Sequence, residues 1–491
     1  MMLLALLAAG LGQFQQHADV GAPKLAGGAA YDAGREEYTL RAGGVNMWGR
    51  RDEFHFAWKL MSGDFILHAR LELVGKGVDA HRKAGWMVRH SLDDDSPYAD
   101  VAVHGDGLVS LQFRRQKAAI TEQIQSATKG ADVVQLERRG GVYTLRTARF
   151  GEPFTVFQLT DLDLGDQVSV GLFVCSHNPD VVEQAVFRNV RITRPAAADF
   201  TPYRDYIGSQ LELLDVESGR RQPMLYSEQP FEAPNWTPDG KALIYNTSGR
   251  APEWRGRLHR FDLQTRQSSL IDTGFASRNN NDHVLSFDGT RLAISDQSET
   301  GQSTVYTVPV TGGTPQRRTK LTPSYLHGWS PDGKWLVYTG GRDGEYDIYK
   351  IAADGEAEEI RLTNSKGLDD GPEYSPDGRF VYFNSVRSGT MQLWRMGPDG
   401  SNPEQLTNDE FNNWFPHVSP DGKWIAFLSY GKDVDAAAHP YYKHVLLRLM
   451  PAGGGPAKVI AYVYGGQGTI NVPSWSPDSK RLAFVSNSGT P

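Results

Sequence analysis

Three histidines occupy nearly the same place in a repeated stretch of this chain. His283 and His327 stand five residues before the aspartate of a recurring turn, and His417 stands four residues before another. Imidazoles in the company of carboxylate and amide groups suit a divalent metal, which polarises a bound carbonyl or carboxyl. We therefore expect these histidines to hold a divalent metal (Mn, Ca or Zn), with Asp370 or Gln467 as a fourth ligand.

Further polar and aromatic side chains lie close to the same turns. Arg342 and Arg387 suit bidentate recognition of a carboxylate. His439 or Tyr442 would serve as a base that takes a proton from a substrate. The remaining expected substrate-binding residues of this part are Asn281, Asp282, Tyr325, Asp369, Trp414 and Asn471.

The turn itself recurs six times and defines the fold of this part. Ser330-Pro331-Asp332-Gly333 shows it best, and Pro followed by Asp and Gly is typical of a type I turn. The spacings between successive turn aspartates are 49, 44, 45, 44 and 57 residues. Short apolar runs flank each turn, and further strand candidates follow. Four strands in each unit of about 45 residues predict a β-propeller blade. The turn aspartates are Asp239, Asp288, Asp332, Asp377, Asp421 and Asp478.

The blade count closes at six. After the turn at Asp478 the chain has room for only two strands, whereas two spare candidates, Gln210–Asp215 and Arg221–Tyr226, precede the first turn. Together they would complete the last blade, join the two ends of the ring and remove exposed sheet edges. The innermost strand of a blade precedes the turn, which places the histidines at the mouth of the central channel.

His417 presents a geometric difficulty, because it is one position out of step with His283 and His327. Side chains alternate along a strand, so an ideal ring would turn His417 away from the other two. A bulge or a different entry loop around Pro416 must compensate. The alternative for each histidine is that it caps a loop or bonds to backbone carbonyls at the start of its blade.

The first part of the chain lacks the 45-residue repeat. Strand candidates follow one another, with clear alternation in Phe65–Leu73 and no convincing amphipathic helix. We expect an all-β sandwich over residues 24–195, a linker over 196–202 and the propeller over 203–491. Residues 1–23 are expected to be a signal or an N-terminal tail.

Several stretches of this first part resemble the concanavalin-like jelly-roll domains of carbohydrate-acting proteins. They are Gly44–Trp48, Asp52–Phe56, Gly63–Phe65 and Ala84–Arg89. The resemblance implies glycan binding on the concave face or the loops, where aromatic faces stack on sugar rings. Burial in the core is the alternative for the two tryptophans. The candidate residues are Trp48, Trp86, Arg89 and Tyr98.

The Trp-Ser-Pro-Asp-Gly repeat is similar to that of the TolB-like propeller family, over residues 203–491. That family includes periplasmic protein-binding propellers and also oligogalacturonate lyases, whose propellers hold a divalent metal on histidines. The resemblance therefore implies the propeller fold but does not choose between these functions.

Composition narrows the functional classes. A net charge of −7 without a long basic run argues against nucleic acid as the main partner. The single cysteine, Cys175, excludes an intramolecular disulfide and a cysteine-based zinc site. The apolar first twelve residues resemble a secretory signal, although the usual positive start is missing, and they are too short to span a bilayer. We expect a periplasmic or secreted protein without stable membrane insertion.

Two functional hypotheses follow from these observations. The first is an exported enzyme that binds a glycan with the jelly roll and cleaves acidic oligosaccharides at the propeller mouth. Lyase chemistry at a uronate is the favoured form, with metal-assisted hydrolysis close behind. The second is a non-catalytic TolB-type propeller that binds a periplasmic protein or a peptidoglycan-associated partner.

Overall fold

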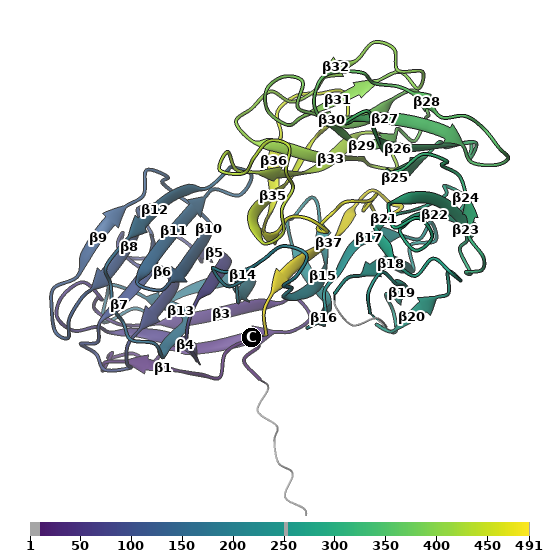
Figure 1. Cartoon of the computed structure of the whole chain (residues 1–491). Coiled ribbons are helices and arrows are strands. Elements are labelled where there is room, and N and C mark those ends of the chain that lie inside the picture. The colour runs from purple at the N-terminus through teal and green to yellow at the C-terminus, as the bar shows by residue number, and fades with distance from the viewer. Residues whose placement is uncertain (1–9, 250–253, 491) are drawn as a thin grey trace, which may run out of the picture. The chain divides into compact units, whose positions relative to one another are not determined.

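The computed structural model describes residues 10–249 and 254–490. Within these ranges the protein is all-β, with 37 strands and no helix (Figure 1). The chain divides into two compact units between Arg194 and Pro195. None of the described segments is a helix with the length and apolar character needed to cross a membrane.

The N-terminal unit contains two antiparallel sheets of seven strands each. Their orders are β1-β4-β13-β6-β7-β8-β9 and β12-β11-β10-β5-β14-β3-β2. The strands are β1 Gln16–Val20, β2 Gly28–Asp32, β3 Glu37–Ala42, β4 Phe54–Met61, β5 Phe65–Leu73, β6 Lys83–Arg89, β7 Tyr98–His104, β8 Val109–Arg114, β9 Glu122–Gln125, β10 Val133–Arg139, β11 Val142–Ala148, β12 Thr155–Leu159, β13 Val168–Cys175 and β14 Glu183–Thr193.

The two sheets share one apolar core and form a sandwich. Alternation along β5 points Phe65, Leu67 and Ala69 to the same side, where they join a single buried cluster. Trp86 of β6, in the other sheet, belongs to the same cluster. Burial of apolar side chains of this size stabilises the fold by about 1.5–3 kcal/mol each. Cys175 is also buried, which raises the pKa of its thiol to about 11.

One boundary differs from the sequence-based expectation. Residues 16–20, expected to belong to a signal or tail, form β1, which pairs with β4 from Gln16↔Trp58 to Val20↔Phe54. Phe14 joins the apolar core of the sandwich, and Val20 is buried in a separate apolar cluster. Residues 1–9, which carry most of the apolar N-terminal run, lie outside the described residues.

The C-terminal unit contains five antiparallel four-stranded sheets, which are blades one to five of a propeller. Each sheet is formed by four strands that are consecutive in the chain. The strands are β17 Phe231–Trp236, β18 Ala242–Thr247, β19 Leu258–Asp262 and β20 Ser268–Ile271; β21 Asn279–Leu285, β22 Arg291–Asp296, β23 Thr304–Pro309 and β24 Gln316–Arg317; β25 Ser324–Trp329, β26 Trp335–Arg342, β27 Glu345–Ala352 and β28 Ile360–Arg361; β29 Asp369–Tyr374, β30 Val381–Ser385, β31 Gln392–Met396 and β32 Glu404–Gln405; β33 Asn412–Val418, β34 Trp424–Tyr430, β35 Lys443–Pro451 and β36 Lys458–Gly465.

The sixth blade joins the two ends of the propeller and confirms the predicted closure. Its strands are β15 (Gly208–Asp215), β16 (Arg221–Ser227) and β37 (Arg481–Ser488), in the order β16-β15-β37. β15 pairs with β37 over its whole length. An isolated bridge between Trp475 and Leu482 stands where the innermost strand of this blade would run.

The six predicted turns are confirmed in detail. In each turn a Ser or Thr hydroxyl donates a hydrogen bond to the turn aspartate, as Ser330 does to Asp332 at 2.6 Å. The residue after the aspartate has a left-handed backbone, with φ of 70° at Gly333 and 60° at Ser479. These bonds lower the pKa of the Asp332 carboxyl. The repeated aspartates therefore build turns rather than a catalytic site.

Each innermost strand of blades one to five contains a break in its pairing register. These β-bulges leave one to three residues unpaired, and bulges of this kind re-aim side chains at the rims of β-structures. The breaks lie between Glu232 and Asn235, Asn279 and His283, Leu326 and Gly328, Asp370 and Glu373, and Trp414 and His417.

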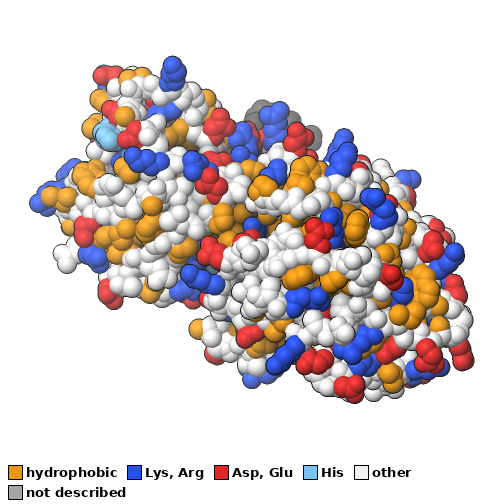
Figure 2. Space-filling model, turned by 90° about the horizontal axis from the view of Figure 1, so that it is seen from above, with side chains coloured by type: hydrophobic (Ala, Val, Ile, Leu, Met, Phe, Trp, Pro, Cys, Tyr) orange, Lys and Arg blue, Asp and Glu red, His pale blue; other side chains and the backbone are white. Residues whose placement is uncertain are grey.

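On the face of the protein seen in Figure 2, acidic and basic side chains are interspersed.

Candidate functional site

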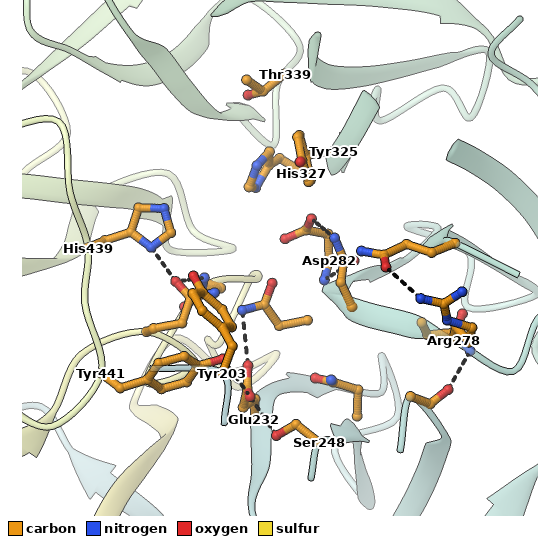
Figure 3. Close-up of a pocket in the computed structure, with 18 of the residues that line it drawn as sticks. Tyr203, Glu232, Ser248, Arg278, Asp282, Tyr325, His327, Thr339, His439 and Tyr441 are labelled. Atoms are coloured by element: carbon orange, nitrogen blue, oxygen red, sulfur yellow. Dashed lines mark hydrogen bonds between the residues drawn. The ribbon is translucent and has the colours of Figure 1, made fainter. Parts of the chain in front are cut away.

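A cavity of about 700 Å³ lies at the mouth of the propeller. Side chains from all six blades line it, together with Tyr203 and Tyr206 from the segment before β15. Figure 3 shows His327, His439, Asp282, Glu232 and the tyrosines arranged around an open centre. Its volume falls within the range of sites that bind small molecules or short segments of chain.

The lining follows a simple rule in the repeat. The residue seven positions before the turn aspartate is the last paired residue before the register break in blades one, four and five. In blade two it lies within the break, and in blade three it is paired two positions before the bulged His327. Five of these six residues line the cavity, and Trp414 is buried behind it. The six are Glu232, Asn281, Tyr325, Asp370, Trp414 and Asn471.

An ion pair between neighbouring blades lies on one side of the cavity. His327 Nε2 is 3.2 Å from Asp370 Oδ1, and Thr339 donates a hydrogen bond to the same oxygen at 2.7 Å. Burial alone would lower the pKa of His327, but the bond and charge of Asp370 outweigh it and raise the pKa. Burial likewise opposes ionisation of Asp370, yet His327 lowers its pKa to about 2. The pair therefore favours the charged form, an imidazolium beside a carboxylate.

Asp282 is a second acidic group of the cavity, on β21 of blade two. Asn280 donates from its side chain to the Asp282 carboxylate at 2.8 Å and accepts from the Asp282 backbone at 3.1 Å. Burial raises the pKa of Asp282 to about 7, and nearby Asp370 adds to this, although His327 opposes it. Asp282 therefore exchanges a proton near neutral pH.

Glu232 of blade one is the third carboxyl. Ser248 and Tyr441 donate to its Oε1 at 2.6 and 3.2 Å, and Asn281 donates to its Oε2 at 3.1 Å. Burial raises the pKa of Glu232 in spite of these three bonds. The consecutive residues Asn281 and Asp282 thus connect the acidic groups of blades one and two.

His439 lies in the loop between β34 and β35 and faces the cavity. Its ring packs edge-on against Trp414 and Phe415, with centroids 4.6 and 5.4 Å apart. Its Nδ1 donates a hydrogen bond to the side-chain oxygen of Gln467. Burial lowers the pKa of His439, so the imidazole is neutral at neutral pH. His439, predicted as a base, and Gln467, predicted as a metal ligand, both line the cavity and form a hydrogen-bonded pair.

Tyrosines form one wall of the mouth. Tyr441 makes T-shaped contacts with Tyr203 and Tyr206, with centroids 5.5 and 6.2 Å apart. Tyr442, predicted as a base, instead anchors the segment that carries these residues. Its hydroxyl accepts from the backbone of Ile207 at 3.1 Å, and burial raises its pKa. A phenol that is buried and engaged in this way does not lie in the cavity lining.

Two of the three histidines predicted to hold a metal are structural. His283 has returned to the regular ladder opposite Ile294, and its Nε2 bonds to the backbone oxygen of Ile244 at 3.2 Å. Burial lowers its pKa to about 4. A bulge does lie beside His417, as expected, but every innermost strand of the first five blades has one.

That bulge therefore does not bring His417 into line with His327. His417 pairs opposite Ala426 and bonds to Glu373 through Nδ1 at 2.6 Å and to the carbonyl of Ile470 through Nε2. Of the three histidines, only His327 lines the cavity, because in blade three it is itself the bulged residue. The predicted ring of three imidazoles does not form.

The two predicted arginines and Asp369 also lie outside the cavity lining. Arg342 pairs with Glu359 at 2.7 Å and donates to the carbonyl of Pro323 at 2.7 Å. Arg387 pairs with buried Asp369 at 2.9 Å. These guanidinium groups stabilise blades three and four, because buried carboxylates require partners.

The described residues contain no group of three or more His, Cys, Asp or Glu side chains placed to hold a metal ion. His327 and Asp370 bond to each other, and His439 bonds to Gln467. Each side chain predicted to hold Mn, Ca or Zn thus already has a hydrogen-bond or ion-pair partner within the protein, and these side chains do not form one ligand set.

The glycan candidates of the N-terminal unit are mostly internal. Trp86 is fully buried in the sandwich core. Arg89 is fully buried beside Asp52 at 2.9 Å, and the hydroxyl of buried Tyr98 donates to the backbone of Met47 at 2.6 Å. Trp48 alone of the four candidates is half-buried, on the loop before β4.

Sequence reasoning missed Glu232, Tyr203 and Tyr206, and it placed Tyr441 at the same end of the propeller without giving it a role. The signal for Glu232 was present in the repeat, because it stands seven residues before its turn aspartate, two positions upstream of the place that His283 and His327 occupy in their blades. The tyrosines gave no repeat signal, because the segment before β15 and the loop after β34 lie outside the blade pattern.

Comparisons with known proteins place the propeller among related chains. The family profile described as the TolB beta propeller domain (PD40) matches residues 320–439. An uncharacterised protein of Agrobacterium fabrum is 46% identical over 278 residues, which are 56% of this chain and 92% of that protein. The solved structure of a candidate TolB from Agrobacterium tumefaciens is 44% identical, with a TM-score of 0.55, and covers 58% of this chain and 100% of its own.

A more distant relative is the Tol-Pal system protein TolB of Bordetella pertussis. It is 28% identical over 150 residues, which are 30% of this chain and 32% of that protein. The chain therefore spans about a third of the length of this relative.

Proposed function

The chain belongs to the TolB-like β-propeller family, and from this premise we propose that it is a periplasmic binding protein whose propeller mouth captures a segment of a partner protein. The relationship to TolB supports this function over catalysis, because the Bordetella relative is by name a component of the Tol-Pal system. A binding role also requires no metal.

The chemistry of the cavity lining carries the proposal. Amide side chains such as Asn246, Asn281 and Asn471 line the cavity, and amides pair with both the N–H and the C=O groups of an extended chain. Tyr203, Tyr206 and Tyr441 add aromatic surface of the type that dominates binding energy at protein interfaces. The lining thus offers hydrogen bonds for a backbone and faces for side chains.

Site-specific photo-crosslinking tests this function. A benzophenone amino acid would replace Tyr203, which is 70% exposed at the mouth, or Leu270, which is 57% exposed on β20. In intact cells, we expect a discrete covalent partner from position 203 and none from position 270. A synthetic peptide of the crosslinked partner segment must then bind the purified protein with 1:1 stoichiometry. Identical products from both positions, or a peptide that does not bind, would overturn the proposal.

A second candidate is an acid–base enzyme that acts on an oligosaccharide, and one observation favours it. The Asp282 carboxyl, with a pKa of about 7, is a group that can donate a proton to a leaving oxygen at neutral pH. A panel of acidic and neutral polysaccharides, read by reducing ends and by absorbance of unsaturated products, tests it. Turnover that the Asp282→Asn variant loses would favour the enzyme over the binding protein.

For the N-terminal unit we propose the concanavalin-like jelly-roll arrangement and a glycan-binding role. The two seven-stranded antiparallel sheets support the fold, and half-buried Trp48 supports the role. Glycan-array binding of the full chain that Trp48→Ala abolishes would support this assignment. Binding that Trp48→Ala leaves unchanged would remove its only remaining aromatic candidate.

A further inference from the structure

The cavity presents three carboxyl groups, and of these only Asp370 forms an ion pair within it, although the charge of His327 also acts on Asp282. Asp370 is paired with His327 at 3.2 Å. Among the described residues, the hydrogen-bond partners of Glu232 and Asp282 are all neutral hydroxyls, amides and backbone groups. Burying a carboxylate without a directly bonded cation is costly, and burial raises the pKa of both groups in spite of His327 beside Asp282, so they favour either a proton or a bound cation.

Glu232 and Asp282 are held toward the same space. Asn280 and Asn281 are consecutive residues, and they donate to Asp282 and Glu232 respectively, at 2.8 and 3.1 Å. The two carboxyls thus belong to neighbouring blades but are fixed by one stretch of β21. Figure 3 shows both of them beside the open centre of the cavity.

An aromatic wall adjoins this acidic pair. Tyr441 donates to Glu232 at 3.2 Å, and the rings of Tyr203 and Tyr206 stand nearly perpendicular to it, at 80° and 79°. Tyrosine faces attract cations and also cover the methylene groups of a long aliphatic side chain. Carboxyls and aromatic faces together are complementary to an organic cation.

We propose that the propeller mouth binds an aliphatic ammonium group, such as a lysine side chain, between Glu232 and Asp282 with its methylene chain against the tyrosines. This inference rests on the proposed function, because a captured partner segment would supply the ammonium group. An ammonium suits the site better than a guanidinium does. Glu232 and Asp282 each already accept hydrogen bonds within the protein, so the lone pairs that remain for a ligand lie on two separate carboxyl groups. The three N–H donors of an ammonium can rotate to reach both groups, whereas a guanidinium presents its donors in a rigid plane that suits one carboxylate.

The rim adds a preference for the neighbouring residue of the ligand. Arg255 and Arg278 line the outer part of the cavity and are exposed. Their positive charges repel a second cation at the rim and attract a carboxylate. A lysine next to an acidic residue is therefore the expected recognition unit.

Calorimetric titration of the full chain tests the inference. The probes are N-acetyl-Glu-Lys-Gly-amide, the same peptide with norleucine in place of lysine, the arginine version, and free cadaverine. We expect the lysine peptide to bind at least tenfold more tightly than the norleucine peptide and more tightly than the arginine version. Cadaverine binding would show that a free amine suffices, whereas binding of the peptide alone would assign the site to a polypeptide lysine; both results support an ammonium site.

Variants and matched controls complete the test. Asp282→Asn and Glu232→Gln should each weaken lysine-peptide binding at least tenfold, with thermal unfolding confirming that both variants fold. Asp288→Asn in the turn of the same blade and Glu228→Gln on an exposed loop remove the same charge elsewhere and should have no effect. Equal binding of the lysine and norleucine peptides, or no effect of Asp282→Asn and Glu232→Gln, would overturn the inference. A crosslinked partner segment that binds without any lysine would overturn the ammonium site and leave the proposed function standing.

Discussion

His327 Nε2 lies 3.2 Å from Asp370 Oδ1 on the neighbouring blade. Asp370 raises the pKa of His327, and His327 lowers the pKa of Asp370. The imidazole is available to the carboxylate because it is the bulged residue of β25. The bulge that removes His327 from the sheet ladder thus also brings its imidazole to Asp370 in the lining of the cavity. This pair links the fold of two blades to the electrostatics of the cavity.

The first prediction concerns this pair. Asp370→Asn should lower the pKa of His327, because burial is then unopposed, and NMR titration of the ring measures the change. Asp370, with its low folded pKa, adds stability above the unfolded value of about 3.9, and His327, with its raised pKa, adds stability below about 6.5. Asp370→Asn should therefore lower the free energy of unfolding most between about pH 3.9 and about pH 6.5, by about 3–5 kcal/mol, as expected for a broken buried ion pair.

The control for this prediction is Thr339→Val, which removes only the neutral hydrogen bond to Asp370. It should cost about 1 kcal/mol and leave the charge pair in place. A His327 pKa that Asp370→Asn leaves unchanged would contradict the ion pair.

The second prediction concerns the pH dependence of stability at Asp282. Its folded pKa of about 7 lies some three units above the unfolded value, so the folded state holds a proton that the unfolded state has lost. Stability should fall as pH rises from about 4 to 7, by about 4 kcal/mol at about 1.4 kcal/mol per unit. The charged groups that act on Asp282 are His327, Asp370 and Glu232.

Asp282→Asn should remove this dependence. The variant should match the wild type at pH 4 and be more stable than it at pH 8 in urea unfolding of the propeller. Asp288→Asn should keep the wild-type slope, because the hydrogen bonds from Ser286 and Thr290 lower the pKa of this exposed turn carboxyl below that pH range. A variant that is less stable at pH 8 would show that Asp282 is stabilised as a carboxylate by groups other than those named.

The fold of the propeller could be predicted from the sequence because its signals are local and repeated. The Pro-Asp-Gly turns fix each hairpin, and the unpaired strand candidates at both ends require the closure that β15 and β37 make. The first part of the chain offered only alternation, which identified strands such as β5 but not their sheet order. Its short strand β1 was mistaken for part of a tail, because five residues carry too little pattern.

The cavity could be predicted only in part, because the decisive feature is a bulge. Counting back from the turn aspartates found the mouth, but a bulge was expected only beside His417, and a regular ladder was assumed up to His283 and His327. The register breaks in every innermost strand of blades one to five, and it breaks one residue later in blade three. No pattern of residue types shows where that break falls, so His327 reaches the cavity while His283 does not.

A third prediction separates a structural histidine from a metal ligand. His417→Ala leaves the Glu373 carboxyl, bonded to His417 at 2.6 Å, without this partner in a buried setting. It should destabilise the propeller by about 2–3 kcal/mol without changing peptide binding at the mouth or metal content. His90→Ala is the control: His90 is exposed in the N-terminal unit and bonds through Nδ1 to the Leu164 carbonyl at 3.0 Å, so its loss should leave propeller stability unchanged. Stoichiometric metal in the purified protein that His417→Ala removes would restore the metal hypothesis.

The fourth prediction concerns the closure of the ring. Phe484 on β37 is fully buried, pairs opposite Glu212 of β15, and lies under the guanidinium of Arg221, 5.2 Å from its ring centroid. Ser486 of the same strand donates to Glu212 at 2.7 Å. Burial of Phe484 and the hydrogen bond to the buried Glu212 carboxylate thus stabilise the pairing of β37 with β15.

Phe484→Ala should therefore cost about 3–5 kcal/mol of propeller stability, since it leaves a cavity at this junction. Phe287→Ala, at an exposed turn of blade two, is the matched control and should cost less than about 0.5 kcal/mol. A chain that stops at Lys480 would leave β15 as an open edge, so it should aggregate and become sensitive to protease across all blades. Because each blade packs only on its two neighbours, opening the ring at one junction frees both of its ends. A truncated chain that unfolds at the wild-type temperature would show that the blades are stable without closure.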